Sequence, residues 1–297
     1  MSFNLSNLAP WTDENSGILI SEAVLGADLM NYVTVRPGYA AGTVAINVLD
    51  MSGMVFDNRS CGWSPTGTTT FDQIPVTVEN IQSKQSLCVQ DLRDYWLSSQ
   101  MNPSAFGEEL PFEQFIAAEA VKQTRLNLEQ KMGAAIISEF TQANGCSLQG
   151  GTPAGLTAGN ALDQVNELID ALPQNVLSRT DLIMYMSYAN FRALTRGLVV
   201  ANYFHFAPGD KVLNYGLGQT VIIPGTNVTA VPVAGLGTSN RIICGPKEHI
   251  IAVTGLTDDQ DKINIWYSRD NDEVRMLSAY RIGLAGLYNS FATNDLA

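Results

Sequence analysis

The two histidines, His205 and His249, are the side chains in this sequence best suited to act as general bases near neutral pH. Nucleophilic catalysis by serine or cysteine needs such a base within hydrogen-bonding reach. His205 lies among aromatic residues in NYFHFAP, and His249 follows Lys247 and Glu248 in a turn-like stretch before the apolar run IIAV. A packed or solvated histidine explains both contexts, and no GxSxG motif precedes a helix. The sequence therefore predicts no catalytic residue.

Acidic residues gather in two short polar stretches near the C-terminus. They are Asp258, Asp259 and Asp261 in TDDQD, and Asp270, Asp272 and Glu273 in SRDNDE. A calcium loop needs alternating acids, a glycine at its sixth position and a glutamate at its twelfth, and neither stretch has this pattern. Solvated hairpin turns are the simpler interpretation, and a weak divalent-ion contact at a subunit junction is the alternative. We predict no metal-binding residue.

Cysteines and glycine-rich stretches also lack the spacing of a cofactor site. Cys61, Cys88, Cys146 and Cys244 are 27 or more positions apart, which excludes close CxxC pairs and favours free thiols in a reducing compartment. GLGQTV at 216 and GLGTSN at 235 both lack the third glycine of a dinucleotide-binding loop. We interpret both as turns and predict no cofactor.

Composition argues against tight binding to nucleic acid or insertion into a membrane. The net charge is -12, with 17 Lys and Arg in 297 residues, so the chain has no electrostatic footprint for a phosphate backbone. Nothing approaches the ~18 consecutive apolar residues of a membrane span, and the N-terminus has no signal-peptide pattern. Aromatic residues without interleaved Arg or Lys are expected to be packing anchors between chains: Trp63, Phe71, Tyr95, Trp96 and Trp266.

The clearest element is a helix of about thirty residues, beginning at Pro111 and ending at the stop signal Asn144-Gly145. At ~1.5 Å per residue it would be ~45 Å long, which suits a strut better than a compact pocket. Its predicted inward stripe is Phe115, Ala118, Val121, Leu128, Met132, Ile136 and Phe140, with Lys122, Arg125, Glu129 and Lys131 largely off it. Four acids lie near its start: Glu108, Glu109, Glu113 and Glu119. General acid-base catalysis would need two of them facing each other across a cleft, and the helix dipole explains those near Pro111 without such a cleft.

Shorter elements surround this helix. Extended segments at 43–48 and 73–82, separated by a long polar excursion, predict a projecting hairpin. A helix at 160–172, a buried strand at 181–186, a helix capped by Ser187 and three short strands predict a mixed α+β region. The C-terminal section predicts a long hairpin that turns at Asp270 to Asp272. Residues 1–42 have the composition of an arm without a core of its own.

This order of parts resembles the major capsid proteins of tailed phages, whose fold is named after phage Hong Kong ninety-seven. GTTTFDQIPVTVENIQSKQSLCVQDLRDYW resembles the returning E-loop strand, SRTDLIMYMSYANFRALTRGL the strand-then-helix segment, and EVRMLSAYRIGLAGLY the closing ribbon. The resemblance implies an α+β fold divided along the whole chain. Its parts are an N-terminal arm (1–42), an E-loop (43–85), a P-domain with the spine helix (86–150), an A-domain (151–254) and a C-terminal β ribbon returning to the P-domain (255–297).

The resemblance implies a structural protein with no catalytic, cofactor or metal site. It implies self-assembly into pentamers and hexamers of an icosahedral shell around double-stranded DNA, which is touched only weakly and non-specifically. Scaffolding, portal and decoration proteins are candidate partners, and assembly would occur in the host cytoplasm without a membrane. Lys84 is the only lysine before residue 100, which implies a shell without the covalent crosslink of the founding phage.

Two alternatives stay open at this point. A nanocompartment shell of the same fold, enclosing an enzyme cargo, has the same sequence pattern. A hydrolase or metal enzyme that uses the two histidines is the alternative from another class. Because the arm begins almost at Met1, we expect a separate scaffolding protein or none.

Overall fold

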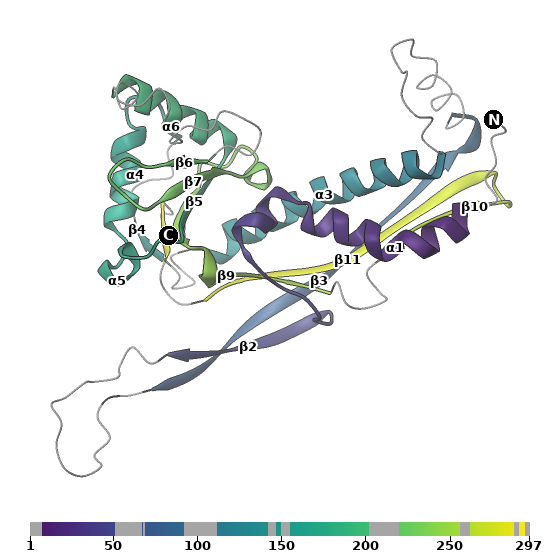
Figure 1. Cartoon of the computed structure of the whole chain (residues 1–297), viewed down its shortest axis with the longest axis horizontal. Coiled ribbons are helices and arrows are strands. Elements are labelled where there is room, and N and C mark those ends of the chain that lie inside the picture. Colours follow the sequence, from purple (N-terminus) through teal and green to yellow (C-terminus); the bar gives the residue numbers. More distant parts are fainter. Residues whose placement is uncertain are drawn as a thin grey trace.

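The computed structural model describes residues 8–50, 67, 69–91, 112–141, 147–149, 155–201, 220–255, 262–287 and 291–294. These residues form an elongated molecule with two sheets, shown in Figure 1. The first sheet consists of β1 (Thr34–Arg36), β2 (Gly42–Asp50), β3 (Thr70–Cys88), β9 (Ile250–Thr254), β10 (Lys262–Ser268) and β11 (Glu273–Gly286).

Strand β11 organises the first sheet, whose order is β1-β9-β11-β3-β2, with β10 also paired to β11. Ten residues of β11, Glu273 to Ile282, pair antiparallel with β3. The start of β11 pairs with β10, and its end pairs with β9. The turn between β10 and β11 passes through Asp272 at a φ of 52°, which confirms the predicted C-terminal hairpin.

The second sheet has the order β4-β12-β8-β5-β7-β6. We call the part of the molecule built on the first sheet and α3 the first half, and the second sheet with its helices the second half. Every residue of the central strand β5 is buried, because helices cover one face of the second sheet and the first half covers the other. The sheet consists of β4 (Ser147–Gln149), β5 (Leu182–Met186), β6 (Val221–Ile222), β7 (Thr229–Pro232), β8 (Ile242–Pro246) and β12 (Phe291–Thr293).

Helices α4 (Ala161–Asp170) and α6 (Tyr188–Val200) cover the outer face of the second sheet, and the short α5 (Gln174–Leu177) lies between them in the chain. Ser187 caps α6 as predicted, since its side chain accepts a hydrogen bond from the Asn190 backbone N–H. Phe191, Leu194 and Leu198 point inward from α6, also as predicted.

The predicted long helix is α3 (Phe112–Glu139), which has 28 residues and is about 42 Å long at ~1.5 Å per residue. Its buried residues Val121, Leu128, Met132 and Ile136, followed by Phe140, confirm most of the predicted stripe. Ala118 is exposed, contrary to prediction, because Ala117 and Ala120 take the inward positions. The predicted stop at Asn144-Gly145 lies outside the described residues, and the helix ends before it.

Glu129 is buried, although its charge led us to place it off the inward stripe. Its carboxylate accepts a hydrogen bond of 2.7 Å from the backbone N–H of Asp28. This N–H begins the 3-10 helix η1 (Asp28–Tyr32), where backbone donors have no partner within the helix. A long-range polar contact of this kind leaves no trace in local periodicity.

The N-terminal segment packs into the core of its own chain, which corrects the expectation of an arm without a core. Helix α1 (Leu8–Leu25) buries Leu19, Ile20, Ala23 and Val24 in the cluster that also contains α3 and β10 residues. The Thr12 hydroxyl donates a 2.9 Å hydrogen bond to the Ile265 carbonyl. These four apolar residues have helical spacing, but the polar residues around them obscured this pattern, so no helix was predicted here.

Sheet pairing crosses the predicted boundaries. Strand β9 pairs with β1 and β11 in the first sheet, although it falls within 151–254. The segment 255–297 was expected to return to the P-domain as a β ribbon. Its strands β10 and β11 lie in the first sheet, whereas β12 pairs with β8 and β4 in the second. Strand β3 extends past residue 85 along β11. The chain therefore passes between the two halves more than once, and local sequence patterns do not report such long-range pairing.

Helix α3 also contacts the second half through two glycines. Gly133 of α3 lies against Gly235 in the 3-10 helix η3 (Ala234–Leu236), and a Cβ at Gly133 would lie 2.1 Å from the Gly235 carbonyl carbon. Only a residue without a side chain permits this approach. The contact fixes α3 against the loop that follows β7.

Replacing Gly133 by alanine should therefore lower the free energy of unfolding by about 2–4 kcal/mol, because backbone has to move to admit the methyl group. Gly17→Ala in α1 is the matched control, since its Cβ meets nothing within 4 Å. It should stabilise the subunit by about 0.5–1 kcal/mol. Urea midpoints of the purified chain measure both, and equal shifts for the two variants would contradict the close contact.

Burial raises the pKa of Glu129 above the ordinary glutamate value, although the Asp28 N–H acts in the opposite direction. The folded subunit then binds this proton more tightly than the unfolded chain, so the corresponding stability is lost as pH rises through the raised pKa. Glu129→Gln keeps an acceptor oxygen and has no proton to lose. The variant should gain stability over the wild type as pH rises from about 4.5 to about 8.

The control is Glu119→Gln on the exposed face of α3. A hydrogen bond from Gln123 lowers the pKa of Glu119, so its effect on stability has the opposite sign. Urea midpoints across the pH range distinguish the two variants. A constant difference between Glu129→Gln and wild type over that range would refute the assignment.

Candidate functional site

His249 is the sequence-predicted histidine that the structure places, and it is packed as predicted. It ends the 3-10 helix η4 (Lys247–His249), with its ring edge-on to Phe291 at a centroid distance of 6.5 Å. Burial, followed by the nearby Arg179 cation, lowers the pKa of its imidazole. The ring therefore joins η4 to strand β12, which lies between β4 and β8 in the second sheet. His205 lies outside the described residues.

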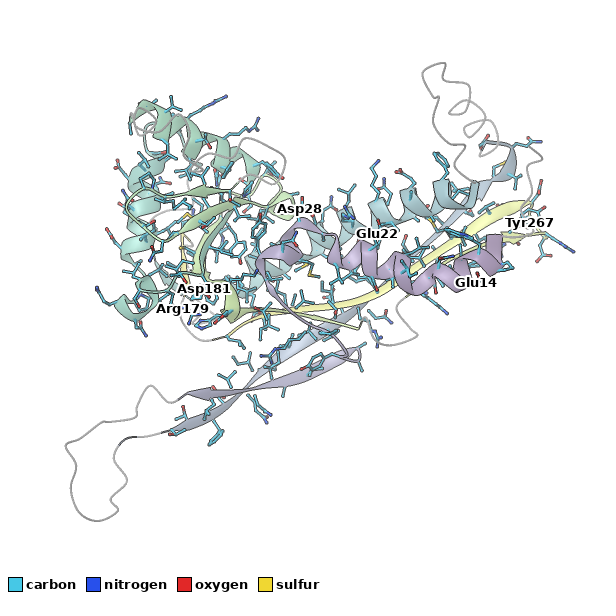
Figure 2. All side chains as sticks on the ribbon, in the orientation of Figure 1. Glu14, Glu22, Asp28, Arg179, Asp181 and Tyr267 are labelled. Atoms are coloured by element: carbon cyan, nitrogen blue, oxygen red, sulfur yellow. The ribbon has the colours of Figure 1, made fainter. Side chains whose placement is uncertain are left out.

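A three-residue charge cluster lies beside His249. The guanidinium of Arg179 donates to both carboxylate oxygens of Asp181 at 2.7 and 2.9 Å, and to Glu248 at 2.7 Å. Figure 2 shows Arg179 beside Asp181 at the lower edge of the second sheet. The bond from Arg179 holds the pKa of Asp181 below its usual range. The cluster links the start of β5 to η4, so these charged side chains stabilise the fold.

The cysteines that the structure describes are free, as predicted. Cys88 is exposed on β3, and Cys244 is buried in β8. Burial raises the pKa of the Cys244 thiol to about 12, which keeps it protonated and unreactive. Cys61 and Cys146 lie outside the described residues.

No group of three or more metal-ligating side chains occurs within the described part of the chain. Asp270 and Asp272 form the polar turn between β10 and β11, as the simpler interpretation predicted. The TDDQD acids lie outside the described residues. GLGTSN forms η3 and the turn after it, where Gly237 has a φ of 54°. None of the described helices is long and apolar enough to cross a membrane.

The expected aromatic anchors divide into two groups. Phe71 is 84% exposed on β3, and Trp266 is half-buried on β10. Three expected anchors, Trp63, Tyr95 and Trp96, lie outside the described residues.

Of the acids near the start of the long helix, Glu108 and Glu109 also lie outside the described residues. Glu119 faces solvent on α3, hydrogen-bonded to Gln123.

The most distinctive surface is on the β2–β3 hairpin, which projects from the body in Figure 1. One face of its strands is buried: Ile46, Val48, Val76 and Val78 pack with residues of β9 and β11. The opposite face, which we call the outer hairpin face, is exposed along its whole described length. It consists of Thr43, Ala45, Asn47, Leu49, Phe71, Gln73, Pro75 and Thr77.

Two large apolar side chains lie together on the outer hairpin face. Leu49 and Phe71 are directly paired across the strands and are 45% and 84% exposed. A cross-strand apolar pair normally gains stability by shielding from water, which these two lack in the isolated subunit. Exposed apolar residues at the described end of a projecting hairpin indicate a contact with another molecule.

An apolar groove lies at the other end of the molecule. It runs between the end of β3 and the first turns of α3, has a volume of about 540 Å³, and is lined by Leu87, Phe115, Ile116 and Met276 among others. Sequence reasoning did not find this groove, because its walls come from three segments far apart in the chain. The β2–β3 hairpin and the elements that line the groove, the end of β3 and the first turns of α3, lie at opposite ends of the molecule (Figure 1).

Comparisons with known proteins identify the fold. No protein-family model matches the chain, and no curated protein matches its sequence. A solved structure of the satellite phage P4 procapsid with its size determination (Sid) protein contains a chain that matches at a TM-score of 0.56 and 11% identity. This match covers 93% of the present chain and 89% of the other.

Two further structures match over similar lengths. A chain in the capsid of an empty GTA particle has a TM-score of 0.53 and 14% identity, covering 90% of this chain and 88% of that one. The SrpI encapsulin complex from Synechococcus elongatus PCC 7942 has a TM-score of 0.52 and 11% identity, covering 91% and 87%. The chain therefore has the α+β fold named after phage Hong Kong ninety-seven, as its sequence predicted.

Proposed function

We propose that this chain is the major capsid protein of a tailed phage, which self-assembles into the icosahedral shell around a double-stranded DNA genome. The observation that carries the proposal is the outer hairpin face, with Leu49 and Phe71 exposed on a projecting arm. A two-stranded hairpin is marginally stable in water, so its projecting part gains stability when a neighbour covers it. The capsid structures with the same fold support this assignment.

The chemistry of the described side chains supports a structural protein and not an enzyme. Arg179 forms ion pairs with Asp181 and Glu248. His249 packs on Phe291. These side chains hold elements together, and the buried Cys244 thiol stays protonated.

The proposal includes the partners expected of such a subunit. Copies of the chain would form pentamers and hexamers through repeated head-to-tail contacts. Scaffolding, portal and decoration proteins are further partners, and the packaged DNA is held by weak, non-specific contact because the chain is acidic overall. Assembly takes place in the host cytoplasm, and the mature location is the virion.

A nanocompartment shell is the second candidate, favoured by the structural match to the SrpI encapsulin complex. Both candidates form hollow particles, so particle formation does not separate them. Their contents do: a phage shell is filled through packaging of DNA, whereas a nanocompartment encloses a protein. Mass spectrometry and nuclease-protection analysis of particles from the natural source distinguish the two.

Purified protein, alone or with a scaffolding protein from the same source, should form large hollow particles. Negative-stain electron micrographs and sedimentation velocity measure this directly. The shell proposal requires that particle mass is many times the 32.1 kDa of one chain. A persistent monomer under all assembly conditions would contradict it.

Substituting both exposed residues of the hairpin, Leu49→Ser with Phe71→Ser, should leave the subunit folded and weaken assembly. Each residue is exposed in the single subunit, so its change costs the monomer little. Burial of both in an interface is worth about 3–5 kcal/mol per subunit, which corresponds to a shift of about a hundredfold or more in the protein concentration needed for assembly.

The matched control is Asn47→Ser with Gln73→Ser, a polar pair on the same face joined by a 3.0 Å side-chain hydrogen bond. It should change the required concentration far less. Light scattering against protein concentration compares the two variants, with circular dichroism as the check on folding. Equal effects of the apolar and polar pairs would count against an apolar contact at the hairpin.

A further inference from the structure

Helix α4 presents an acidic face to solvent. Asp163, Glu167 and Asp170 recur at helical spacing and are exposed, while Val165 and Leu168 face the core. The ten residues of α4 include no lysine or arginine. This side of the second half therefore carries three negative charges in a row, which we call the acidic α4 face.

Helix α6 presents a face of the opposite charge. Arg192 and Arg196 are exposed one turn apart, and the helix has no acidic residue. Val199 and Val200 follow on the same side and are 53% and 70% exposed. We call this surface of Arg192, Arg196, Val199 and Val200 the basic α6 face. It combines two cations with two apolar side chains whose exposure to water is unfavourable.

The charges of these two faces are not paired within one copy. The ion pairs of the described residues join Lys122 to Glu119, Arg179 to Asp181 and Glu248, and Arg275 to Glu273. Within the part of the chain that the structure describes, the acids of α4 and the arginines of α6 take no part in an ion pair. Both sets remain available to a second molecule.

The two helices lie on different sides of the second half. Figure 1 shows α6 along the top of this half and α4 along its left side. A closed ring of identical subunits needs two different, complementary surfaces on each copy. The acidic α4 face and the basic α6 face differ and are complementary in charge.

We propose that the acidic α4 face of one copy docks on the basic α6 face of the next copy around a ring. This inference rests on the proposed shell function and assigns its ring contact to named residues. Because the chain carries a net charge of -12, copies repel one another in most orientations. Local charge complementarity then selects the one register in which the faces meet, and burial of Val199 and Val200 adds apolar stabilisation.

Charge reversal tests the contact. The variant Glu167→Lys with Asp170→Lys makes both faces basic, and Arg192→Glu with Arg196→Glu makes both acidic. Each variant alone should need about tenfold or more protein to assemble than the wild type, because attraction becomes repulsion at every junction. The four-substitution variant restores opposite charges on the two faces, and it should assemble at concentrations close to those of the wild type.

Mixing the two reversal variants in equal amounts provides a test between copies. The basic α4 face of one variant then meets the acidic α6 face of the other, so the mixture should assemble where neither variant does. Strict alternation closes a hexamer and leaves one like-charged junction in a pentamer. Micrographs should therefore show sheets or tubes of hexamers more often than closed particles. A mixture that assembles no better than its components would overturn the proposal.

The control for the α4 variant is Glu14→Lys with Glu22→Lys, which makes the same change in net charge on the exposed side of α1 (Figure 2). It should assemble like the wild type, and an equal defect would show that net charge alone is responsible. Should a reversal variant lose its fold by circular dichroism, the neutral variant Arg192→Gln with Arg196→Gln replaces it. It should still need more protein to assemble than the wild type, and assembly at wild-type concentrations would refute the contact.

This design separates the inference from the proposed function. Wild-type protein that forms no particles would contradict the shell itself. Wild-type particles together with normal assembly of both reversal variants would contradict only the contact between α4 and α6.

Discussion

The packing of α3 against both sheets is the constraint on which the rest of the structure depends. Leu128, Met132 and Ile136 are fully buried in a cluster that includes residues of both halves. At Gly133 the helix backbone touches the backbone of Gly235, so the helix position is fixed by atoms that no rotamer change can move. Because α3 is held in this way, it fixes the position of one half relative to the other. In the proposed shell, a subunit needs this fixed geometry if both of its ends are to contact neighbouring copies correctly.

Two hydrogen bonds that involve the N-terminal segment strengthen the contact between the two halves. Glu129 accepts the Asp28 N–H and so satisfies a donor at the start of η1, and the Tyr185 hydroxyl donates to the Tyr32 carbonyl. These bonds connect η1 to α3 and to the second sheet. The N-terminal segment therefore holds the two halves together where they meet.

Sequence patterns predicted the elements whose stability is local and apolar. The stripe on α3, the buried run of β5 and the Ser187 cap are repeats or signals within a few residues, and each was found where it was expected. The failures involve pairing over long separations. Glu129 contacts Asp28, 101 positions away, and Thr12 contacts Ile265, 253 positions away. Charge and polarity predict exposure on average, and they fail where a distant partner satisfies the polar group.

In the proposed shell, the outer hairpin face and the charged faces of α4 and α6 contribute two different kinds of interaction to assembly. The apolar pair on the hairpin, Leu49 and Phe71, can supply free energy but little orientation, since apolar burial is non-directional. The charged faces of α4 and α6 can supply orientation at modest energy, since exposed ion pairs are individually weak and opposite charges still exclude wrong registers. A closed shell needs contacts weak enough to be corrected during growth and specific enough to fix curvature. In the proposed shell, the apolar contact would lie on the projecting hairpin and the charged contact on the second half, with α3 between them, which would meet both conditions.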